Sequence, residues 1–316
     1  MPEQTIHLTA LREATNSAQL DPSARECAIR HEHATRFGAL LVDLPYFQGF
    51  AGELVRHLLG LPPRQSTWGQ RLHDGGAILL LRSLVEVARQ TRDPAVAAAT
   101  LGLASHAAID RSIHPLVNAL AKRYPISGDH ETSHREAEKL HSICFHEVYF
   151  GRDVLGTREV ATHFGVQSAS AEVLRAVCQA FEQTFGDGPS TADLISFQRG
   201  YSLHVALLSS FPGRQLAPRK ARELARTRYM RGSWGTFASA LESAVASSVR
   251  VINAVWAAIE APSGDRDAAL ALVAQVLPLG SIDPDGGDAE LDAPYVASLS
   301  ERAAGVSPAL ARALVC

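Results

Sequence analysis

Residues 102–118 of the chain read GLASHAAIDRSIHPLVN and place His106, Asp110 and His114 four residues apart. On an α-helix this spacing puts the three side chains on one face, because a helix has about 3.6 residues per turn. A single histidine on an apolar helix face is usually a hydrogen-bonded core residue. Two imidazoles around one carboxylate on the same face are instead typical of a metal site.

A second segment, SHREAEKLHS at residues 133–142, repeats the four-residue step with His134 and Glu138. If its helix packs against the first one, three imidazoles and two carboxylates converge on one small volume. This mixture of nitrogen and oxygen ligands suits zinc or another borderline divalent metal, iron included.

The composition is that of a globular protein rather than a nucleic-acid-binding one. The chain has 316 residues, of which 46% are hydrophobic, so it can bury a sizeable core. Lys and Arg number 30 against 33 Asp and Glu, which gives a net charge of -3. Without an excess of basic residues we expect no nucleic-acid partner.

Cysteine usage and the N-terminal residues bear on location. The four cysteines are widely separated and form no CxxC pair, as expected of free thiols in a reducing compartment. Residues 1–14, MPEQTIHLTALREA, lack the basic start and apolar run of a signal peptide. No stretch has the ~18 apolar residues of a membrane span. These features predict a cytoplasmic location and no transmembrane segment.

Helix formers and apolar residues recurring every three or four positions predict an all-α fold, a multi-helix bundle. No alternating strand pattern of any length competes. The predicted helices cover residues 3–18, 22–37, 50–60, 69–89, 94–114, 130–149, 169–185, 191–210, 219–230, 237–259 and 265–277.

Breaks in this pattern predict three regions. Residues 1–150 form a helical region with the metal site, and residues 151–279 add helices that complete the same bundle. Residues 280–316 are predicted to be a linker and a C-terminal helical tail. Their acidic stretch, SIDPDGGDAELDAP at residues 281–294, lacks the register of a calcium loop and reads as a solvated linker.

Three further residues carry expectations. His114 precedes Pro115, so we expect the helix to end or kink there, which turns a ligand toward a metal. Asp43 stands alone in FGALLVDLPYF at residues 37–47, either as a buried carboxylate that needs a cation or hydrogen-bond donors, or as a helix cap. His73, in WGQRLHDGGA at residues 68–77, begins a strongly apolar helix and could face inward.

Four pieces of the chain, in order, resemble a known family. They are GALLVDLPYF, RLHDGG, GLASHAAIDRSIHPLVN and SHREAEKLHS, and they look like the signature of the bacterial zinc-dependent phospholipases C. That family shares its all-helical fold with the single-strand-specific zinc nucleases. The similarity covers about residues 37–147 and implies phosphate-ester hydrolysis at a cleft that holds three zinc ions.

Carried over to this sequence, the resemblance implies two sets of zinc ligands. The first set is Asp43, His73, His106 and Asp110, and the second is His114, His134 and Glu138. Asp110 would also bridge toward a third zinc ion.

The third site is where the chain departs from the family pattern. Secreted members use an N-terminal tryptophan and a nearby histidine, whereas this chain begins Met1-Pro2 and has no early tryptophan. His7 is the best positional match for the histidine, with His31 and His33 as rivals. The prediction is therefore two or three zinc ions.

In such a site Asp43 is the expected catalytic residue, orienting the attacking water or taking its proton, because the other candidates are committed as ligands. No serine or cysteine nucleophile is required, and the sequence has no Gly-x-Ser-x-Gly motif and no phosphate-binding P-loop. The substrate is expected to be a small-molecule or phospholipid phosphate ester.

Two alternatives use the same residues differently. His73-Asp74 is a literal HD pair which, with His31 or His33 before it and Asp110 after it, resembles the HD-domain metal phosphohydrolases and their di-iron oxygenase relatives. That assignment gives no role to His106, His114, His134 and Glu138. The other alternative is a non-catalytic helical binding protein with a degenerate zinc site.

Overall fold

A computed structural model describes residues 3–59, 61, 66–125, 130–216, 223, 234–262 and 265–283. Within these residues the regular structure is helical, which confirms the predicted all-α class. No helix among them is long and apolar enough to cross a membrane. The elements are α1 (Glu3–Asn16), α2 (Pro22–Arg30), α3 (Glu32–Leu40), η1 (Leu44–Phe47), α4 (Phe50–Leu58), α5 (Thr67–Arg71), η2 (Leu72–Gly76), α6 (Ala77–Thr91), α7 (Pro94–Arg123), α8 (His130–Phe150), α9 (Arg158–Phe164), α10 (Ala171–Phe185), α11 (Thr191–Leu208), η3 (Phe211–Leu216), α13 (Trp234–Glu260) and α14 (Arg266–Val276).

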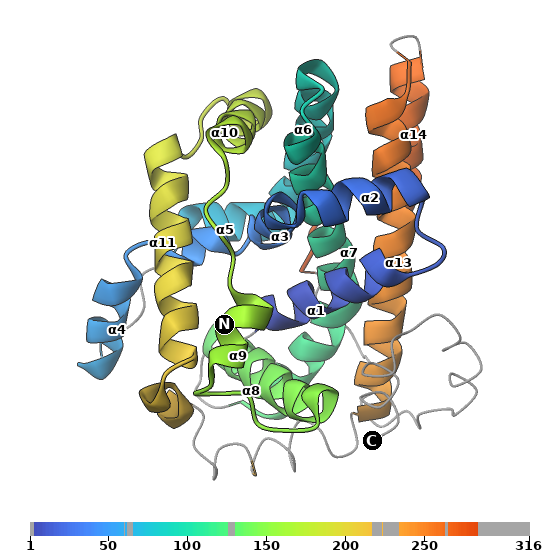
Figure 1. The fold of residues 1–316 in the computed structure, drawn as a ribbon. Coiled ribbons are helices and arrows are strands. Elements are labelled where there is room, and N and C mark those ends of the chain that lie inside the picture. Colours follow the sequence, from blue (N-terminus) through green and yellow to red (C-terminus); the bar gives the residue numbers. More distant parts are fainter. Residues whose placement is uncertain are drawn as a thin grey trace.

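Helix α7 is the centre of the arrangement (Figure 1). Its start is well specified, because Asp93 accepts hydrogen bonds from the backbone N–H groups of Ala95 and Val96, and Pro94 occupies the first helical turn. Helices α3, α6, α8 and α13 pack against it. Most of its residues from Val96 onward are buried, so α7 is a core helix rather than an amphipathic surface one.

Of the two predicted outcomes at His114, a helix end or a kink, the end is wrong, since α7 continues through Pro115 to Arg123. An interior proline removes one backbone hydrogen bond and crowds the carbonyl of the residue four positions earlier. Here Ile113, Leu116 and Val117 are buried on either side of it. The burial of this last part of α7 outweighs the local cost of the proline, and it extends the ligand stripe by one turn.

Two other predicted helices are interrupted. The helix predicted over residues 22–37 is divided at His31, whose backbone leaves helical geometry between α2 and α3. The helix predicted over residues 69–89 contains a π-helical turn, η2, in which Gly75 has a φ of 112° that favours glycine. The helix predicted over residues 219–230 lies outside the described residues, apart from residue 223.

Helices α3 and α7 approach backbone to backbone through two glycines. A Cβ on Gly38 would lie 1.9 Å from the carbonyl oxygen of Ala99, and one on Gly102 would lie 2.0 Å from that of Thr35. The contact brings the backbone of α3 alongside the turn of α7 that precedes His106.

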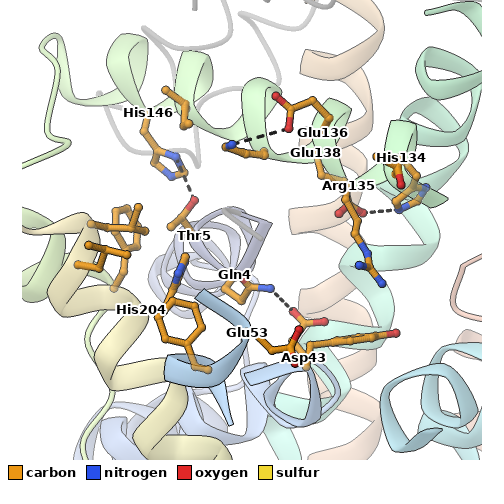
Figure 2. A pocket seen from close by; sticks show the side chains of 18 of the residues that line it. Gln4, Thr5, Asp43, Glu53, His134, Arg135, Glu136, Glu138, His146 and His204 are labelled. Carbon is orange, nitrogen blue, oxygen red and sulfur yellow. Dashed lines mark hydrogen bonds and ion pairs between the residues drawn. The ribbon is translucent and has the colours of Figure 1, made fainter. Parts of the chain in front are cut away.

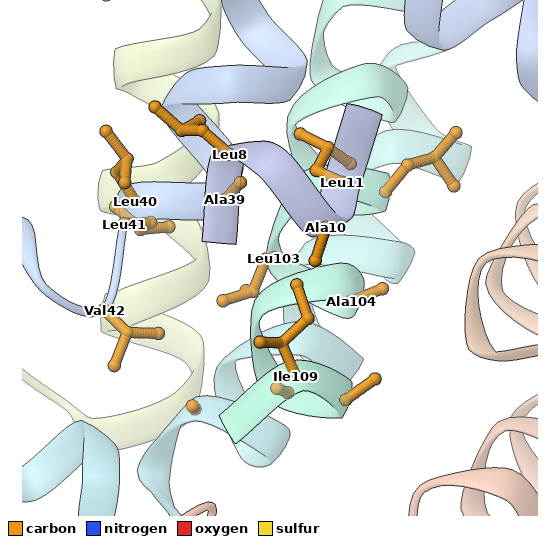
Figure 3. Packing of buried hydrophobic residues seen from close by; sticks show 14 of the residues in the cluster. Leu8, Ala10, Leu11, Ala39, Leu40, Leu41, Val42, Leu103, Ala104 and Ile109 are labelled. Atoms are coloured by element: carbon orange, nitrogen blue, oxygen red, sulfur yellow. The ribbon is translucent and has the colours of Figure 1, made fainter. Parts of the chain in front are cut away.

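Apolar side chains of α1, α3 and α7 fill the core around this contact (Figure 3). They include Leu8, Ala10, Leu11, Ala39, Leu40, Leu103, Ala104 and Ile109. Helices from the second half of the chain cover the other sides: α13 runs along α7, α10 packs on α6, and α11 packs on η1 and α4 (Figure 1).

Replacing Gly38 with alanine should destabilise the protein by about 1–3 kcal/mol or more, because the added methyl group forces α3 away from α7. Chemical denaturation of the full chain measures the change. Gly52→Ala is the matched control, since this exposed glycine of α4 has nothing within 4 Å of the position of a Cβ. Equal stability of the two variants would contradict the backbone contact.

Candidate metal centre

The carboxylate of Asp110 lies at the centre of the predicted ligands and is 1% exposed. Its Oδ1 atom is 3.0 Å from Nε2 of His7 and 3.3 Å from Nε2 of His114. Its Oδ2 atom is 2.9 Å from Nε2 of His106 and 3.8 Å from Nε2 of His73. The two oxygens therefore face different pairs of imidazoles, which is the geometry needed for a carboxylate that bridges two cations.

The remaining predicted ligands complete the cluster from both sides. Nε2 of His73 is 3.5 Å from Oδ1 of Asp43. On α8, Glu138 points toward His134, with which it pairs (Figure 2), and its Oε1 is 3.7 Å from Nε2 of His114. All eight sequence-predicted residues are thus brought together, although they come from α1, the turn before η1, η2, α7 and α8.

Three groups of side chains within this cluster have donor atoms close enough to hold a metal ion. They are His7 with His106 and Asp110, Asp43 with His73 and His106, and His114 with His134 and Asp283. The second consists of three residues of the first predicted zinc set, and the first joins His7, the candidate for the third site, to His106 and Asp110 of that set. In the third group, Asp283 stands where the sequence analysis expected Glu138, which nevertheless lies beside both histidines.

Backbone carbonyls fix the orientation of two of the rings. Nδ1–H of His106 donates to the carbonyl oxygen of Ala39 at 2.7 Å, and Nδ1–H of His73 donates to that of Gly69 at 2.8 Å. A carbonyl oxygen can only accept, so Nδ1 carries the proton in both rings. In the neutral imidazole Nε2 then holds a lone pair, and it is Nε2 that points at the carboxylates.

A lone pair facing a carboxylate oxygen at 2.9 Å needs a cation between the two. Nε2 of His106 and both oxygens of Asp110 are buried and make no hydrogen bond of acceptable geometry within the described residues. Protonating every ring would place five imidazolium groups in the interior, at a desolvation cost of several kcal/mol per ion. Divalent metals satisfy the same atoms, and imidazoles held by a second hydrogen bond are the usual ligands of such metals. The donor set therefore fits zinc.

Without a metal, the attraction between imidazoles and carboxylates shifts the pKa values of both kinds of group in the cluster. Burial lowers the pKa of His73, but the hydrogen bond to Asp43 and the charge of Asp110 outweigh it and raise the pKa to about 9. Burial raises the pKa of Asp110, but the imidazoles of His106 and His114 dominate and hold it well below its ordinary value. The carboxylate is therefore ionised at neutral pH, which leaves its oxygens available as metal ligands.

Asp43 is not a helix cap. It precedes η1 but its side chain makes no capping hydrogen bond, and the residue is 3% exposed. Its Oδ2 accepts a hydrogen bond from Nε2 of Gln4 at 3.2 Å (Figure 2), while Oδ1 faces His73. The open alternative is thus decided in favour of a buried carboxylate that belongs to the cluster.

Of the three candidates for the third site, His7 is the one that lies in the cluster. His7 lies on α1 with its ring stacked on that of His106 at a centroid distance of 4.0 Å. His31 ends α2, and His33 is exposed on α3; neither belongs to a group that could hold a metal among the described residues. The N-terminal residues Met1 and Pro2 lie outside the described residues.

The cluster opens on a cavity of about 650 Å³ (Figure 2). Asp43, His73, His114, His134 and Glu138 line it. The lining also includes apolar side chains, among them Phe50, Leu54, Ile143, Val160, Phe164, Leu207 and Leu208, and charged ones such as Arg135, Lys139 and Glu147. A ligand of small-molecule size can therefore reach the candidate metal centre and cover it with an apolar portion.

Sequence reasoning missed Gln4, Asn118 and Asp283. Asn118 continues the stripe of α7 four residues after His114, a signal that the predicted helix end concealed. The prediction of a solvated linker is wrong for residues 281–283, because Ile282 is fully buried and Asp283 contacts the cluster. The remainder of that predicted linker and tail, residues 284–316, lies outside the described residues.

Comparisons with known proteins add no relative: no family model, no curated protein and no solved structure matches the chain. The case for a metal centre therefore depends on the geometry of its residues.

We expect the purified chain to hold at least two equivalents of zinc, and Asp110→Asn to lose most of them, because an amide cannot neutralise two cations. Elemental analysis after gel filtration measures the content. His141→Ala is the control, because His141 lies outside the cluster. Its buried ring packs on that of Phe237 with a centroid distance of 4.0 Å, and burial lowers its pKa to about 3. Less than one equivalent in the unmodified protein, or equal loss in both variants, would contradict the ligand assignment.

Zinc uptake by the metal-free protein should release protons at pH 7. With a pKa of about 9, His73 is protonated there, and a metal must displace that proton. The apparent affinity should rise with pH until about 9. Calorimetric titration in buffers of different ionisation enthalpy gives the number of protons released, and His73→Gln should release fewer. A binding enthalpy independent of the buffer would show that the ring is already neutral.

Proposed function

We propose that the chain is a metal-dependent hydrolase of phosphate esters, with zinc at a di- or trinuclear centre. The observation that supports this most is the direction of the ring nitrogens. Nδ1 of His73 and of His106 donates to a backbone carbonyl, while Nε2 faces the carboxylates of Asp43 and Asp110. The order and spacing of the residues, which resemble the zinc-dependent phospholipases C, support the same assignment.

Two of the metal positions have at least three protein ligands each. Asp43, His73, His106 and Asp110 would hold the first ion, and His114, His134 and Glu138 the second. A third ion would have His7 and the Oδ1 atom of Asp110. Bound zinc supplies a Lewis acid that polarises the phosphoryl group and offsets the negative charge that develops during the attack of water.

Asp43 is the residue that we assign to the attacking water. Burial raises its pKa, but the charge of His106 and the hydrogen bond with His73 lower it by more, so the carboxylate is ionised and can accept a hydrogen bond. Gln4 holds the Oδ2 atom in place. A carboxylate with a depressed pKa orients the water and passes its proton on, rather than keeping it.

The cavity supports an organic phosphate ester as the substrate. The candidate ligands line it, so the phosphoryl group would lie beside them, and the apolar side chains of the lining suit the organic part of the ester. The proposed substrates are small-molecule phosphodiesters or phospholipids of that shape.

The two alternatives make less use of this geometry. Asp74, the second member of the HD pair, is exposed, and none of Asp74, His31 and His33 belongs to a described group that could hold a metal. A non-catalytic binding protein has no need for a carboxylate held beside the ligands at the end of a cavity.

The zinc-loaded full chain should hydrolyse bis(4-nitrophenyl) phosphate, lose this activity with a chelator and regain it with zinc. His134→Ala should lower the rate by about 10²-fold or more, because it removes a ligand of a zinc ion that would stabilise the charge of the transition state. Asp74→Ala should change the rate little. Release of 4-nitrophenolate measures the rate. The opposite ranking of the two variants would favour the HD alternative, and full metal content without turnover of a phosphodiester or monoester would favour the binding protein.

A further inference from the structure

Residues 280–283, which follow α14, return to the metal cluster; we call them the C-terminal strap. The strap is held to η2 through the carbonyl oxygen of His73. This oxygen accepts hydrogen bonds from the hydroxyl of Ser281 at 2.9 Å and from the backbone N–H of Ile282 at 3.1 Å. Nε of Arg111, on α7, donates to the carbonyl oxygen of Ser281 at 3.3 Å. Three contacts and the buried Ile282 thus hold the strap beside two of the ligand-bearing elements.

The backbone of η2 is shaped to admit the strap. A Cβ on Gly75 would lie 3.2 Å from the backbone of Gly280, and Gly75 itself has a left-handed φ. Gly75 kinks the backbone between α5 and α6 at this point. The same turn therefore carries the ligand His73 and receives the strap.

The strap ends at Asp283, whose Oδ1 atom contacts two residues of α7. It lies 2.9 Å from Nδ1 of His114 and accepts a hydrogen bond from Nδ2 of Asn118 at 2.8 Å. The other end of the Asn118 amide, Oδ1, accepts from Nδ1–H of His134 at 2.7 Å. The carboxylate of Asp283 is thus connected to Nδ1 of His114 directly and to Nδ1 of His134 through Asn118. These are the two histidines of the second predicted zinc set.

This connection constrains both rings, that of His134 through a hydrogen bond and that of His114 through an ionic contact. Because Asp283 can only accept when ionised, Nδ2 of Asn118 must face it, and the amide oxygen must then face His134. With a proton on Nδ1, the Nε2 atoms of His114 and His134 are left to face Glu138. Carbonyls of Ala39 and Gly69 accept from Nδ1–H of His106 and His73, as Asn118 does from that of His134, while Nδ1 of His114 makes a 2.9 Å ionic contact with Asp283.

We propose that Asp283 is a positioning residue of the metal centre, which through His114 directly and His134 by way of Asn118 presets the second zinc position. The inference rests on the proposed metal-dependent function and extends it to the C-terminal strap. Direct ligation by Asp283 is the competing role, since its carboxylate lies with His114 and His134 in one potential metal group. Oδ1 of Asp283 already contacts His114 and Asn118, both on α7, and this favours the positioning role over direct ligation.

Zinc affinity of the full chain tests the proposal, measured by competition with a chromophoric chelator. Asp283→Ala should weaken one zinc equivalent by about 10–100-fold, the usual effect of removing the hydrogen-bond partner of a ligand, and leave the others unchanged. Asp283→Asn keeps an oxygen acceptor and should restore most of the affinity. Asp267→Asn, an exposed aspartate at the start of α14, is the matched control.

A second readout does not need a metal. In the metal-free protein, ¹⁵N NMR of the imidazoles should show His114 with its proton on Nδ1, and Asp283→Ala should shift it toward a mixture of tautomers. The proposal would be overturned if Asp283→Ala bound zinc as tightly as Asp267→Asn. It would also be overturned if Asp283→Ala and Asp283→Asn lost zinc affinity equally, which would indicate that Asp283 is a direct ligand. An unmodified protein that binds no zinc contradicts the metal centre, while the NMR result still reports whether Asp283 sets the His114 tautomer.

Discussion

An ionised carboxylate buried at the centre of the bundle is the constraint on which the rest of the structure depends. Asp110 is 1% exposed, and burying such a charge costs several kcal/mol unless it is compensated. The compensation comes from four imidazoles whose Nε2 atoms lie within 4 Å of its two oxygens. The fold has to deliver these rings from separate segments, and it has to aim them.

The histidine rings are oriented by backbone and side-chain hydrogen-bond acceptors, which helix packing brings beside them. The close approach of α3 to α7 through Gly38 and Gly102 brings the carbonyl of Ala39 to His106. The π-helical turn before α6 sets His73 against the carbonyl of Gly69. Elements that look purely structural therefore determine which nitrogen of each histidine is available, and this is what separates a metal site from a cluster of core histidines.

Such a centre also couples ligand binding to stability. Its side chains come from α1, η2, α7, α8 and the turn before η1, with the C-terminal strap alongside, so a bound metal would hold together segments more than 200 residues apart in the chain. Any ligand that binds only the folded state stabilises it by mass action. A bound metal would accordingly stabilise the C-terminal strap and α1 as well as supply the proposed chemistry.

The sequence by itself determined the all-α class and the stripe of His106, Asp110 and His114, because helical periodicity is a local property that four-residue spacing reveals. It also indicated His134 and Glu138 for the same reason. Asp43 and His73 have no partner nearby in the sequence; their apolar surroundings indicated burial, but only the resemblance to a family assigned them, and His7, to the metal site. The tertiary structure then favoured His7 over His31 and His33. Only the tertiary structure decided that α7 continues through Pro115, that Asn118 joins the stripe, and that Asp283 reaches it from a stretch that looked like a solvated linker. These outcomes depend on burial and on contacts between distant segments, and local spacing carries no information about either.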